Sequence, residues 1–408
     1  MMSLRKRRGF QIGGMEMKES IFSTARIYSF FSPNKILLGA GAAKQIGKEA
    51  RFLDGQKALI VTDPGVVKAG LIESVKESLV SENVEVGIFD KVELEPPARV
   101  IDDCAKIARE DGYNIIVGLG GGSSLDTAKG ASIMATNKGK VLDYTGMDLV
   151  TKRGLPKIFL PTTGSGSEVT RVFAPTDERD NTKKVVYSIF NLADVIIADP
   201  LLTLSLPPDL TADTGVDALV GAIEAYVSVN ATPFSDILAL EATRLISENL
   251  PMVYAKGDHI SARLNMSLAA ILANLAWQSG GLGAVHALSY ILETECHLKH
   301  ARATSIMLPH VMEYNKIGNL VKYAQIAKAM GENIEGLPHY EAAERSVNAV
   351  KKLLTVVNIS FRLSDYGVSK ENLPGLVEGA MKQARLFVPN PRNLTEADVK
   401  NIYLKALE

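Results

Sequence analysis

Strand-like and helix-like patterns alternate in the first half of this chain and give way to helix-like patterns alone in the second. Short β-branched runs read as buried strands at residues 57–62, 84–89, 114–118, 156–160 and 194–198. Amphipathic helical stretches lie near residues 66–81, 99–111 and 123–137. Strands that alternate with helices predict a parallel sheet with helices on both faces. Ligands of such a sheet bind beyond the carboxyl ends of its strands.

The strand signals stop at the Leu-Pro-Pro sequence of residues 206–208. Proline disfavours helix in the residue before it, so these prolines mark a boundary. We therefore predict an α/β domain over residues 26–205 and an all-helical domain over residues 206–408. Residues 1–25 begin with a basic run and lack the apolar core of a signal peptide. We predict a disordered tail; a translation start further along, at Met15 or Met17, and a targeting segment are the alternatives.

Composition limits the partners of the chain. Its 408 residues carry a formal net charge of −1, which gives no general attraction to nucleic acid or to an anionic membrane. No apolar run approaches the roughly 18 residues that span a bilayer. The two cysteines, Cys104 and Cys296, form no Cys-x-x-Cys pair. This cysteine usage is typical of a reducing compartment, and we predict a cytoplasmic protein without nucleic-acid or membrane partners.

A glycine-rich loop at residues 118–129, GLGGGSSLDTAK, follows one predicted strand and opens the next helix. Backbone N–H groups that no side chain obstructs can bind a diphosphate at a helix amino terminus. Ser123 is predicted to cap this helix, with Asp126 at a favourable position in its first turn. A tight turn without a ligand is the alternative. The spacing is not G-x-G-x-x-G, so a standard Rossmann first turn is not predicted.

Asp63 ends the strand of residues 57–62 and precedes Pro-Gly. A carboxylate at this place can accept hydrogen bonds from both hydroxyls of the adenosine ribose and repel a 2′-phosphate, which favours NAD over NADP. Aspartate before Pro-Gly is also an ordinary turn residue. The residues alone leave both interpretations open.

The glycine loop together with several later segments resembles the iron-containing (group III) alcohol dehydrogenases. These segments are PTTGSGSEVT at 161–170, ADPLLTLSLPP at 198–208, VDAL at 216–219, AIEAY at 222–226 and LPHVMEYN at 308–315. The resemblance spans about residues 26 to 400. It implies a Rossmann-like parallel-sheet domain, a helical carboxyl-terminal domain as in dehydroquinate synthase, and a site in the cleft between them.

The resemblance also implies where NAD binds. The implied contacts are made by Asp63, Gly120, Gly121, Gly122, Ser123, Asp126, Thr162, Thr163 and Ser167. Asp63 falls where related NAD enzymes carry a cofactor-selecting aspartate, which strengthens the preference for NAD. The family usually reads PTTAGTGSE, and this chain is one residue shorter after Thr163. We therefore expect a reshaped loop on the nicotinamide side.

Family members bind one divalent ion through an aspartate and three histidines, and this chain matches all but one. Asp217, His286 and His300 match, whereas the position one helical turn after Asp217 holds Gly221. Two histidines and a carboxylate can form a facial triad with open positions, with room left at residue 221. The resemblance favours Fe²⁺, with Zn²⁺ or Mn²⁺ as alternatives, as a Lewis acid at the substrate oxygen. Loss of one ligand from four is expected to weaken metal binding, so a site without metal is the alternative.

Other residues near these ligands are candidates for supporting roles. Asp213, one turn before Asp217, can substitute for the missing ligand but is predicted to serve the helix amino terminus. His297 is a second candidate, predicted to be an exposed loop residue. Tyr290 stands where many family members carry a proton-relaying histidine. Its ordinary pKa of about 10 makes it a poorer shuttle at neutral pH. The implied catalytic residues are Tyr290, His286 and His300.

Two cations flank the last predicted ligand. In a closed cleft, Lys299 and Arg302 can bind a sulfonate, phosphonate or carboxylate on a substrate. The alternative, which we favour, is that both point to solvent or pair with Glu293 or Glu295.

The leading hypothesis is an NAD(H)-dependent enzyme that interconverts a small primary alcohol and its aldehyde, acting as an aldehyde reductase with a divalent metal. The first alternative is a metal-independent reductase of an anionic carbonyl substrate, similar to maleylacetate reductases. A lyase similar to dehydroquinate synthase and a non-catalytic NAD-binding protein carry less weight. The resemblance also implies a homo-oligomer.

Overall fold

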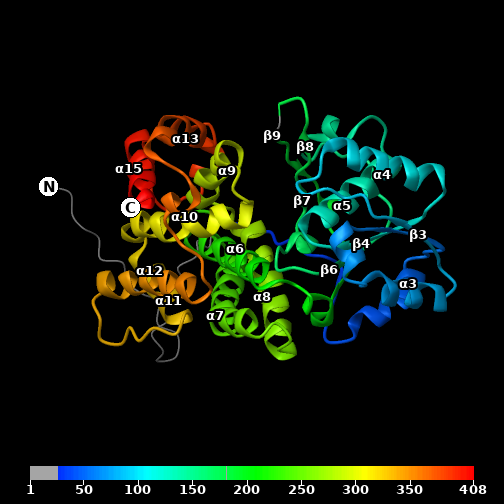
Figure 1. Ribbon diagram of the computed structural model, residues 1–408, viewed down its shortest axis with the longest axis horizontal. Coiled ribbons are helices and arrows are strands. Elements are labelled where there is room, and N and C mark those ends of the chain that lie inside the picture. Colours follow the sequence, from blue (N-terminus) through cyan, green and yellow to red (C-terminus); the bar gives the residue numbers. More distant parts are fainter. Residues whose placement is uncertain (1–25, 181) are drawn as a thin grey trace.

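The molecule consists of two halves that lie side by side along its long axis (Figure 1). The computed structural model describes residues 26–180 and 182–408, so the predicted tail at residues 1–25 lies outside the described residues. A parallel-sheet half comes first and a helical half follows, which confirms the predicted fold class. Helix α6 (Pro208–Val227) opens the helical half, with proline in its first turn. The domain boundaries themselves stay predictions.

A six-stranded sheet organises the first half. Its strand order is β1-β11-β6-β4-β2-β3, and every neighbouring pair is parallel. The strands are β1 (Lys35–Leu38), β2 (Lys57–Val61), β3 (Glu85–Phe89), β4 (Ile115–Gly120), β6 (Lys157–Pro161) and β11 (Val195–Ala198). All the predicted strands are present. The edge strand β1 was not predicted, because its four residues, KILL, are too few to show a periodic pattern.

Helices cover both faces of the sheet. Strand β2 shows why, since Leu59 and Val61 join one hydrophobic cluster and Ala58 and Ile60 join another on the opposite face. The first cluster includes residues of α4 (Ala98–Glu110) and α5 (Gly122–Thr136), and the second includes residues of α1 (Ile46–Phe52) and α3 (Ile72–Ser81). The single helix predicted at 66–81 is wrong. Gly70, at φ 71°, separates α2 (Pro64–Lys68) from α3, because a left-handed backbone cannot continue a right-handed helix.

The second half packs its helices around one apolar core in which α6 is almost entirely buried. The other helices are α7 (Pro233–Ala255), α8 (Ile260–Gly280), α9 (Ala284–Cys296), α10 (His300–Asn315), α11 (Leu320–Ala329), α12 (His339–Val356), α13 (Leu373–Met381), α14 (Ala384–Phe387) and α15 (Glu396–Leu407). Among the described residues, no single helix has the length and hydropathy to cross a membrane; α8 and α9 pass only as a pair bent by 106°.

Short strands lie between the large sheet and the helical half. Strands β5 (Gly146–Met147), β7 (Val172–Phe173) and β10 (Val186–Tyr187) form one small sheet, and β8 (Thr176–Asp177) pairs with β9 (Thr182–Lys183) in a hairpin. These two-residue strands were not predicted, because they are too short to show a periodic pattern. In Figure 1 the hairpin lies on the side of the α/β half that faces α9.

Candidate active site

Three potential metal ligands converge where α6, α9 and α10 meet. Asp217 comes from α6, His286 from the first turn of α9, and His300 is the first residue of α10. One ligand atom from each lies within 4.8 Å of the other two. His286 is buried, whereas Asp217 and His300 are half-buried and leave the cluster open on one side. The structure therefore brings together the three residues proposed as ligands from the sequence.

Each histidine is held by a buried carboxylate. Glu224 Oε2 lies 2.6 Å from Nδ1 of His286, and Glu293 Oε1 lies 2.5 Å from Nδ1 of His300. Because a carboxylate only accepts, each Nδ1 carries the hydrogen and each Nε2 is left to face an ion. Sequence reasoning missed Glu224 and considered Glu293 only as a partner for cations. The available signal for Glu224 was its position two helical turns after Asp217, on the same face of α6.

Hydrogen bonds fix the remaining atoms of this cluster. Glu224 Oε1 accepts a hydrogen bond of 2.7 Å from the backbone N–H of Val285, at the start of α9. Thr304 Oγ1 donates to Asp217 Oδ1 over 2.8 Å. These bonds tie α6 to α9 and α10, so the three donors are positioned before any ligand arrives.

Opposite charges dominate the electrostatics at His300. Burial lowers its pKa, but the carboxylates of Glu293 and Asp217 outweigh this effect and raise the pKa above its ordinary value. Burial raises the pKa of Glu293, but His300 and Lys183 outweigh it and hold that pKa at about 2. Glu293 is therefore an anion at neutral pH. A cluster that attracts a proton this strongly also suits a divalent cation, which displaces that proton on binding.

An indole ring occupies the space beside the position of the missing ligand. A Cβ atom at Gly221 would lie 3.1 Å from Cδ1 of Trp277, a residue of α8. Trp277 Nε1 donates to Asn274 Oδ1 over 2.6 Å, which fixes the ring. The expectation of room at residue 221 is therefore wrong, because Trp277 fills it.

The candidate substitutes do not supply a fourth ligand. Asp213 accepts a hydrogen bond of 2.6 Å from Arg302 Nε. Helix α6 begins at Pro208, so the predicted role of Asp213 at the helix amino terminus is wrong. His297 is exposed, as predicted, and ends α9 with a left-handed backbone at φ 55°.

Tyr290 packs directly on the histidines. Its ring stacks on that of His300 with centroids 5.7 Å apart, and its edge meets His286 at 6.1 Å. Burial, reinforced by the negative charge of Glu293, raises the pKa of Tyr290. Its hydroxyl therefore keeps its proton at neutral pH and can offer a hydrogen bond, but it is a poor base.

The two flanking cations differ in their surroundings. Arg302 is paired with Asp213, and its Nη1 also donates to Tyr366 Oη over 3.2 Å. Lys299 is exposed and precedes α10. The predicted pairing of Arg302 with Glu293 or Glu295 is wrong, because Glu293 is already engaged by His300 and by Lys183.

The cofactor side lies at the carboxyl ends of β2, β4 and β6. Helix α5 starts at Gly122 with Gly121 as its N-cap residue, and Gly120 has φ 149°, which favours glycine. The predicted cap by Ser123 is wrong, because its Oγ accepts instead from the backbone N–H of Glu95, 3.1 Å away. The predicted place of Asp126 in the first turn of α5 is also wrong, because Asp126 begins the second turn.

Asp126 holds a neighbouring loop. Its Oδ1 accepts from Ser167 Oγ over 2.5 Å, and its Oδ2 accepts from the backbone N–H of Ala174 over 3.1 Å. The Ser167 hydroxyl also accepts from Lys129 Nζ, 2.8 Å away. Both predicted cofactor-binding residues thus have a structural task here, and their contact with NAD stays a prediction.

Asp63 and the glycine loop lie at the carboxyl ends of the neighbouring strands β2 and β4, where the order of strands across the sheet reverses. Asp63 Oδ1 accepts from the backbone N–H groups of Gly65 at 2.9 Å and Val66 at 3.1 Å, and caps α2. Its Oδ2 accepts from Ser124 Oγ at 2.9 Å. The turn role is therefore present, and it places the carboxylate beside the expected phosphate loop.

The predicted threonines complete this edge of the sheet. The backbone N–H of Thr162 donates to the carbonyl of Gly120 over 3.0 Å. A Cβ atom at Gly121 would lie 3.2 Å from Cγ2 of Thr163, so Thr163 lies directly beside the glycine loop. A cavity of about 30 Å³ continues from here into the helical half, lined by residues that include Thr163, Gly164, Thr203, Leu206, Thr214 and Met266.

Two family models match the chain. "Iron-containing alcohol dehydrogenase" matches residues 33–200, and "Fe-containing alcohol dehydrogenase family, C-terminal" matches residues 211–407. Parallel strands that end at a glycine loop, beside a cluster of two histidines and a carboxylate, suit an oxidoreductase that uses a dinucleotide and a metal. The chain belongs to the iron-containing alcohol dehydrogenase family, which confirms the resemblance seen in its motifs.

Individual relatives agree over nearly the whole chain. A long-chain-alcohol dehydrogenase from Geobacillus thermodenitrificans is 40% identical over 370 residues, which are 90% of this chain and 93% of the relative. The crystal structure of a 1,3-propanediol oxidoreductase has a TM-score of 0.91 and 38% identity, covering 93% of this chain and 100% of that one. The crystal structure of a sulfoacetaldehyde reductase from Bifidobacterium kashiwanohense in complex with NAD⁺ has a TM-score of 0.86 and 26% identity. The match covers 94% of this chain and 99% of that one.

The family implies NAD and a metal ion, usually iron, and the residues present fit both. Asp217, His286 and His300 supply the two-nitrogen, one-oxygen donor set that suits Fe²⁺ with open positions. A Cβ atom at Gly120 would lie 2.5 Å from Ser124 Oγ, so this position requires glycine, and bare backbone at a helix amino terminus suits a phosphate. The chain is thus an oxidoreductase of the alcohol dehydrogenase type.

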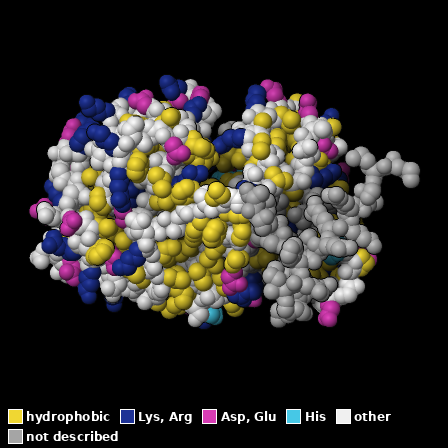
Figure 2. Space-filling model, turned by 180° about the vertical axis from the view of Figure 1, so that it is seen from behind, with side chains coloured by type: hydrophobic (Ala, Val, Ile, Leu, Met, Phe, Trp, Pro, Cys, Tyr) yellow, Lys and Arg dark blue, Asp and Glu magenta, His cyan; other side chains and the backbone are white. Residues whose placement is uncertain are grey.

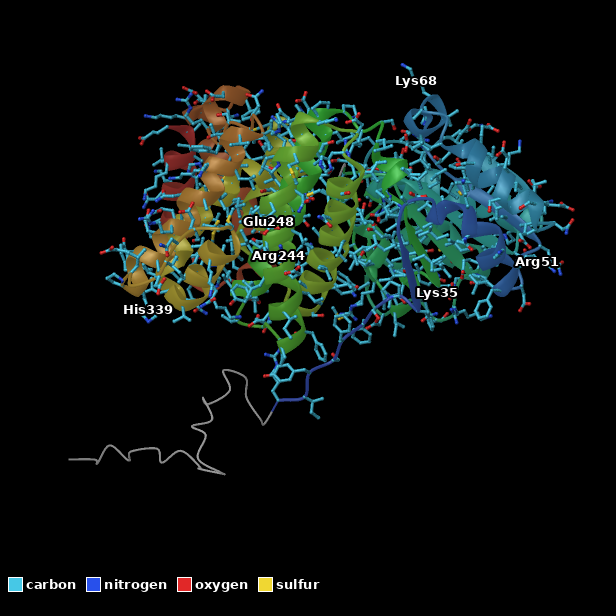
Figure 3. All side chains as sticks on the ribbon, turned by 90° about the horizontal axis from the view of Figure 1, so that it is seen from below. Lys35, Arg51, Lys68, Arg244, Glu248 and His339 are labelled. Carbon is cyan, nitrogen blue, oxygen red and sulfur yellow. The ribbon has the colours of Figure 1, made fainter. Side chains whose placement is uncertain are left out.

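We predict that Glu224→Gln weakens metal binding by about 10- to 100-fold, because a neutral amide orients and polarises His286 less well than a carboxylate. Competition with a chelating dye measures the affinity for Zn²⁺. Glu248→Gln is the matched control, since Glu248 pairs with Arg244 on the exposed face of α7 (Figure 3). Equal affinities of the two variants would contradict the role of Glu224.

We also predict that a histidine at position 221 binds metal only when Trp277 is removed. Gly221→His alone leaves metal affinity unchanged and lowers the free energy of unfolding by about 1–3 kcal/mol, because the side chain collides with the indole. Gly221→His combined with Trp277→Ala tightens Zn²⁺ binding by about tenfold or more through the added ligand. Trp277→Ala alone is the control. Tighter binding by the single Gly221→His variant would show that the indole does not block this position.

Proposed function

We propose that this protein is an NAD(H)-dependent oxidoreductase that interconverts a small primary alcohol and its aldehyde, acting as an aldehyde reductase. One observation carries the proposal. The donor atoms of Asp217, His286 and His300 converge within 4.8 Å of one another, and each histidine is oriented by its own carboxylate. Structural demand alone does not explain two buried carboxylates aimed at two adjacent imidazoles.

In this proposal the chain positions the reactants and the cofactors perform the hydride chemistry. The cluster would hold a divalent ion, which would supply Lewis acidity at the substrate oxygen, and nicotinamide bound at the glycine loop would supply the hydride chemistry. His286 and His300 would hold such an ion through their Nε2 atoms, and the carboxylate of Asp217 would balance part of its charge. Tyr290 lies against His300 at one side of the site and can hydrogen-bond to substrate. Its raised pKa prevents its hydroxyl from acting as the base.

The surroundings of Arg302 favour a neutral substrate. Its charge is balanced by Asp213 and its second hydrogen bond goes to Tyr366. A substrate sulfonate or carboxylate would have to displace Asp213 from this pair, which would leave a buried carboxylate without its partner. Lys299 stays available at the surface, and we propose no role for it in binding.

Metal removal tests the proposal. NADH oxidation is measured with acetaldehyde, a semialdehyde, sulfoacetaldehyde and phosphonoacetaldehyde, before and after chelation and after Fe²⁺ is restored. We expect turnover of the neutral aldehyde to fall by about 100-fold or more without metal and in Asp217→Asn, and to return with Fe²⁺ only in the parent. Lys299→Ala serves as the control and should not change the preference among the aldehydes.

Two outcomes of this experiment would overturn the proposal. Full activity in the chelated protein, with the anionic aldehydes preferred, supports the metal-independent reductase instead. No turnover of any aldehyde supports a protein that only binds NAD.

We further propose that NADH is preferred over NADPH because of the charge on Asp63. Asp63→Asn removes the repulsion of a 2′-phosphate but keeps an N-cap residue that serves α2 equally well. We expect this variant to lower the ratio of KM for NADPH to KM for NADH by about tenfold, which corresponds to 1.4 kcal/mol. The KM for NADH should change little, and unfolding curves control for stability. A parent that already uses both cofactors equally would contradict the proposed role.

We also propose a cytoplasmic location and a homo-oligomeric assembly. Cys104 and Cys296 are both free, which is compatible with the cytoplasm. Figure 2 shows hydrophobic side chains gathered over the centre of the face seen from behind, with charged groups around them. A large exposed apolar area is typical of an interaction surface, and a homo-oligomer is the simplest proposal for it.

A further inference from the structure

A chain of charged side chains crosses from the α/β half to the metal cluster. Lys183 Nζ lies 2.8 Å from Glu293 Oε2 and 3.4 Å from Glu95 Oε1. Glu293 Oε1 in turn lies 2.5 Å from Nδ1 of His300. We call Glu95, Lys183 and Glu293 the cleft bridge.

The bridge begins at the glycine loop. The backbone N–H of Glu95 donates to Ser123 Oγ over 3.1 Å, and Ser123 lies in the first turn of α5, beside the expected phosphate site. Thr176 Oγ1, from strand β8, donates to the carbonyl of Glu95 over 2.9 Å. The β8–β9 hairpin that carries Lys183 is therefore tied to the segment that touches the glycine loop.

The cleft bridge ends at His300, where both carboxylate oxygens of Glu293 have a partner. Both oxygens of Glu293 are used, one by His300 and one by Lys183, so the position of Lys183 fixes the rotation of the carboxylate. The Glu293 side chain is 6% exposed and that of Lys183 is 30% exposed, so water screens their pair only in part. Loss of either partner would leave the other charge poorly compensated.

The neighbouring lysine provides an internal comparison. Lys184 lies next to Lys183 in sequence, but its Nζ pairs with Asp180 at 2.6 Å and approaches Asp177 at 4.0 Å. Both of these carboxylates belong to the hairpin region itself. One hairpin thus carries one lysine that stabilises its own fold and one that reaches the opposite half.

We propose that Lys183 is a positioning residue that aims Glu293 at His300 and thereby couples the cofactor site to the metal site. This proposal rests on the proposed function, since it assumes that NADH binds at the glycine loop and a divalent ion at the cluster. A phosphate that orders the glycine loop also orders Glu95 and the hairpin. The hairpin then holds Glu293, which holds His300 with Nε2 toward the ion. By linkage, the ion must favour NADH binding by the same factor.

Binding measurements test this coupling without catalysis. Fluorescence titrations give the dissociation constant of NADH for the metal-free protein and for the Zn²⁺-loaded protein. We expect Zn²⁺ to tighten NADH binding by about fivefold or more in the parent, within the usual range of coupling between sites. In Lys183→Met this ratio should fall to about one, and Lys183→Arg should retain part of it because the charge remains. Lys184→Met should keep the parent ratio.

The outcomes separate this inference from the proposed function. If the parent binds neither NADH nor Zn²⁺, the proposed function fails and the coupling fails with it. If the parent binds both but Lys183→Met keeps the parent ratio, the coupling alone is overturned. Glu293→Gln provides a second route if Lys183→Met does not fold, because the amide keeps the shape of the carboxylate and should also bring the ratio to about one. If Zn²⁺ still tightens NADH binding by fivefold or more in Glu293→Gln, the proposal is overturned as well.

Discussion

Two carboxylate–histidine hydrogen bonds determine the geometry of the helical half. Glu224 points His286 toward the cluster, and Glu293 does the same for His300. The first bond joins α6 to α9, and the second joins α9 to the first residue of α10. A buried carboxylate without its partner costs several kcal/mol, so these pairs fix the register of the helices as well as the direction of the rings.

The sequence predicted the central strands β2, β4, β6 and β11 well because they are buried on both faces and read as continuous apolar runs. It failed where the strands are short. Strand β1 has four residues, and the hairpin strands β8 and β9 have two each, which is too few for any periodicity. The helix predicted at 66–81 was wrong because a single glycine with positive φ outweighed an otherwise continuous amphipathic pattern.

The site was predictable to the extent that it depends on residue type and order along the chain. Asp217, His286 and His300 follow from motifs and converge as expected. Their partners Glu224 and Glu293 depend on how separate helices pack, which local sequence does not encode. The predicted cap by Ser123 failed for a similar reason, since a backbone N–H from a distant loop takes its hydroxyl. Functional side chains were thus easier to predict than the contacts that hold them.

The two departures from the family pattern are physically connected. The shortened loop after Thr163 places Gly166 against α8, where a Cβ atom would lie 1.8 Å from Nδ2 of Asn274. Asn274 Oδ1 accepts the hydrogen bond from Trp277, and the Trp277 ring fills the space beside Gly221. A larger residue at 166 would push Asn274 away and release the indole, and a larger residue at 221 would collide with it. The loop after Thr163 and the glycine at position 221 therefore both pack against one hydrogen-bonded pair on α8, Asn274 and Trp277, so the space available at each position depends on the other.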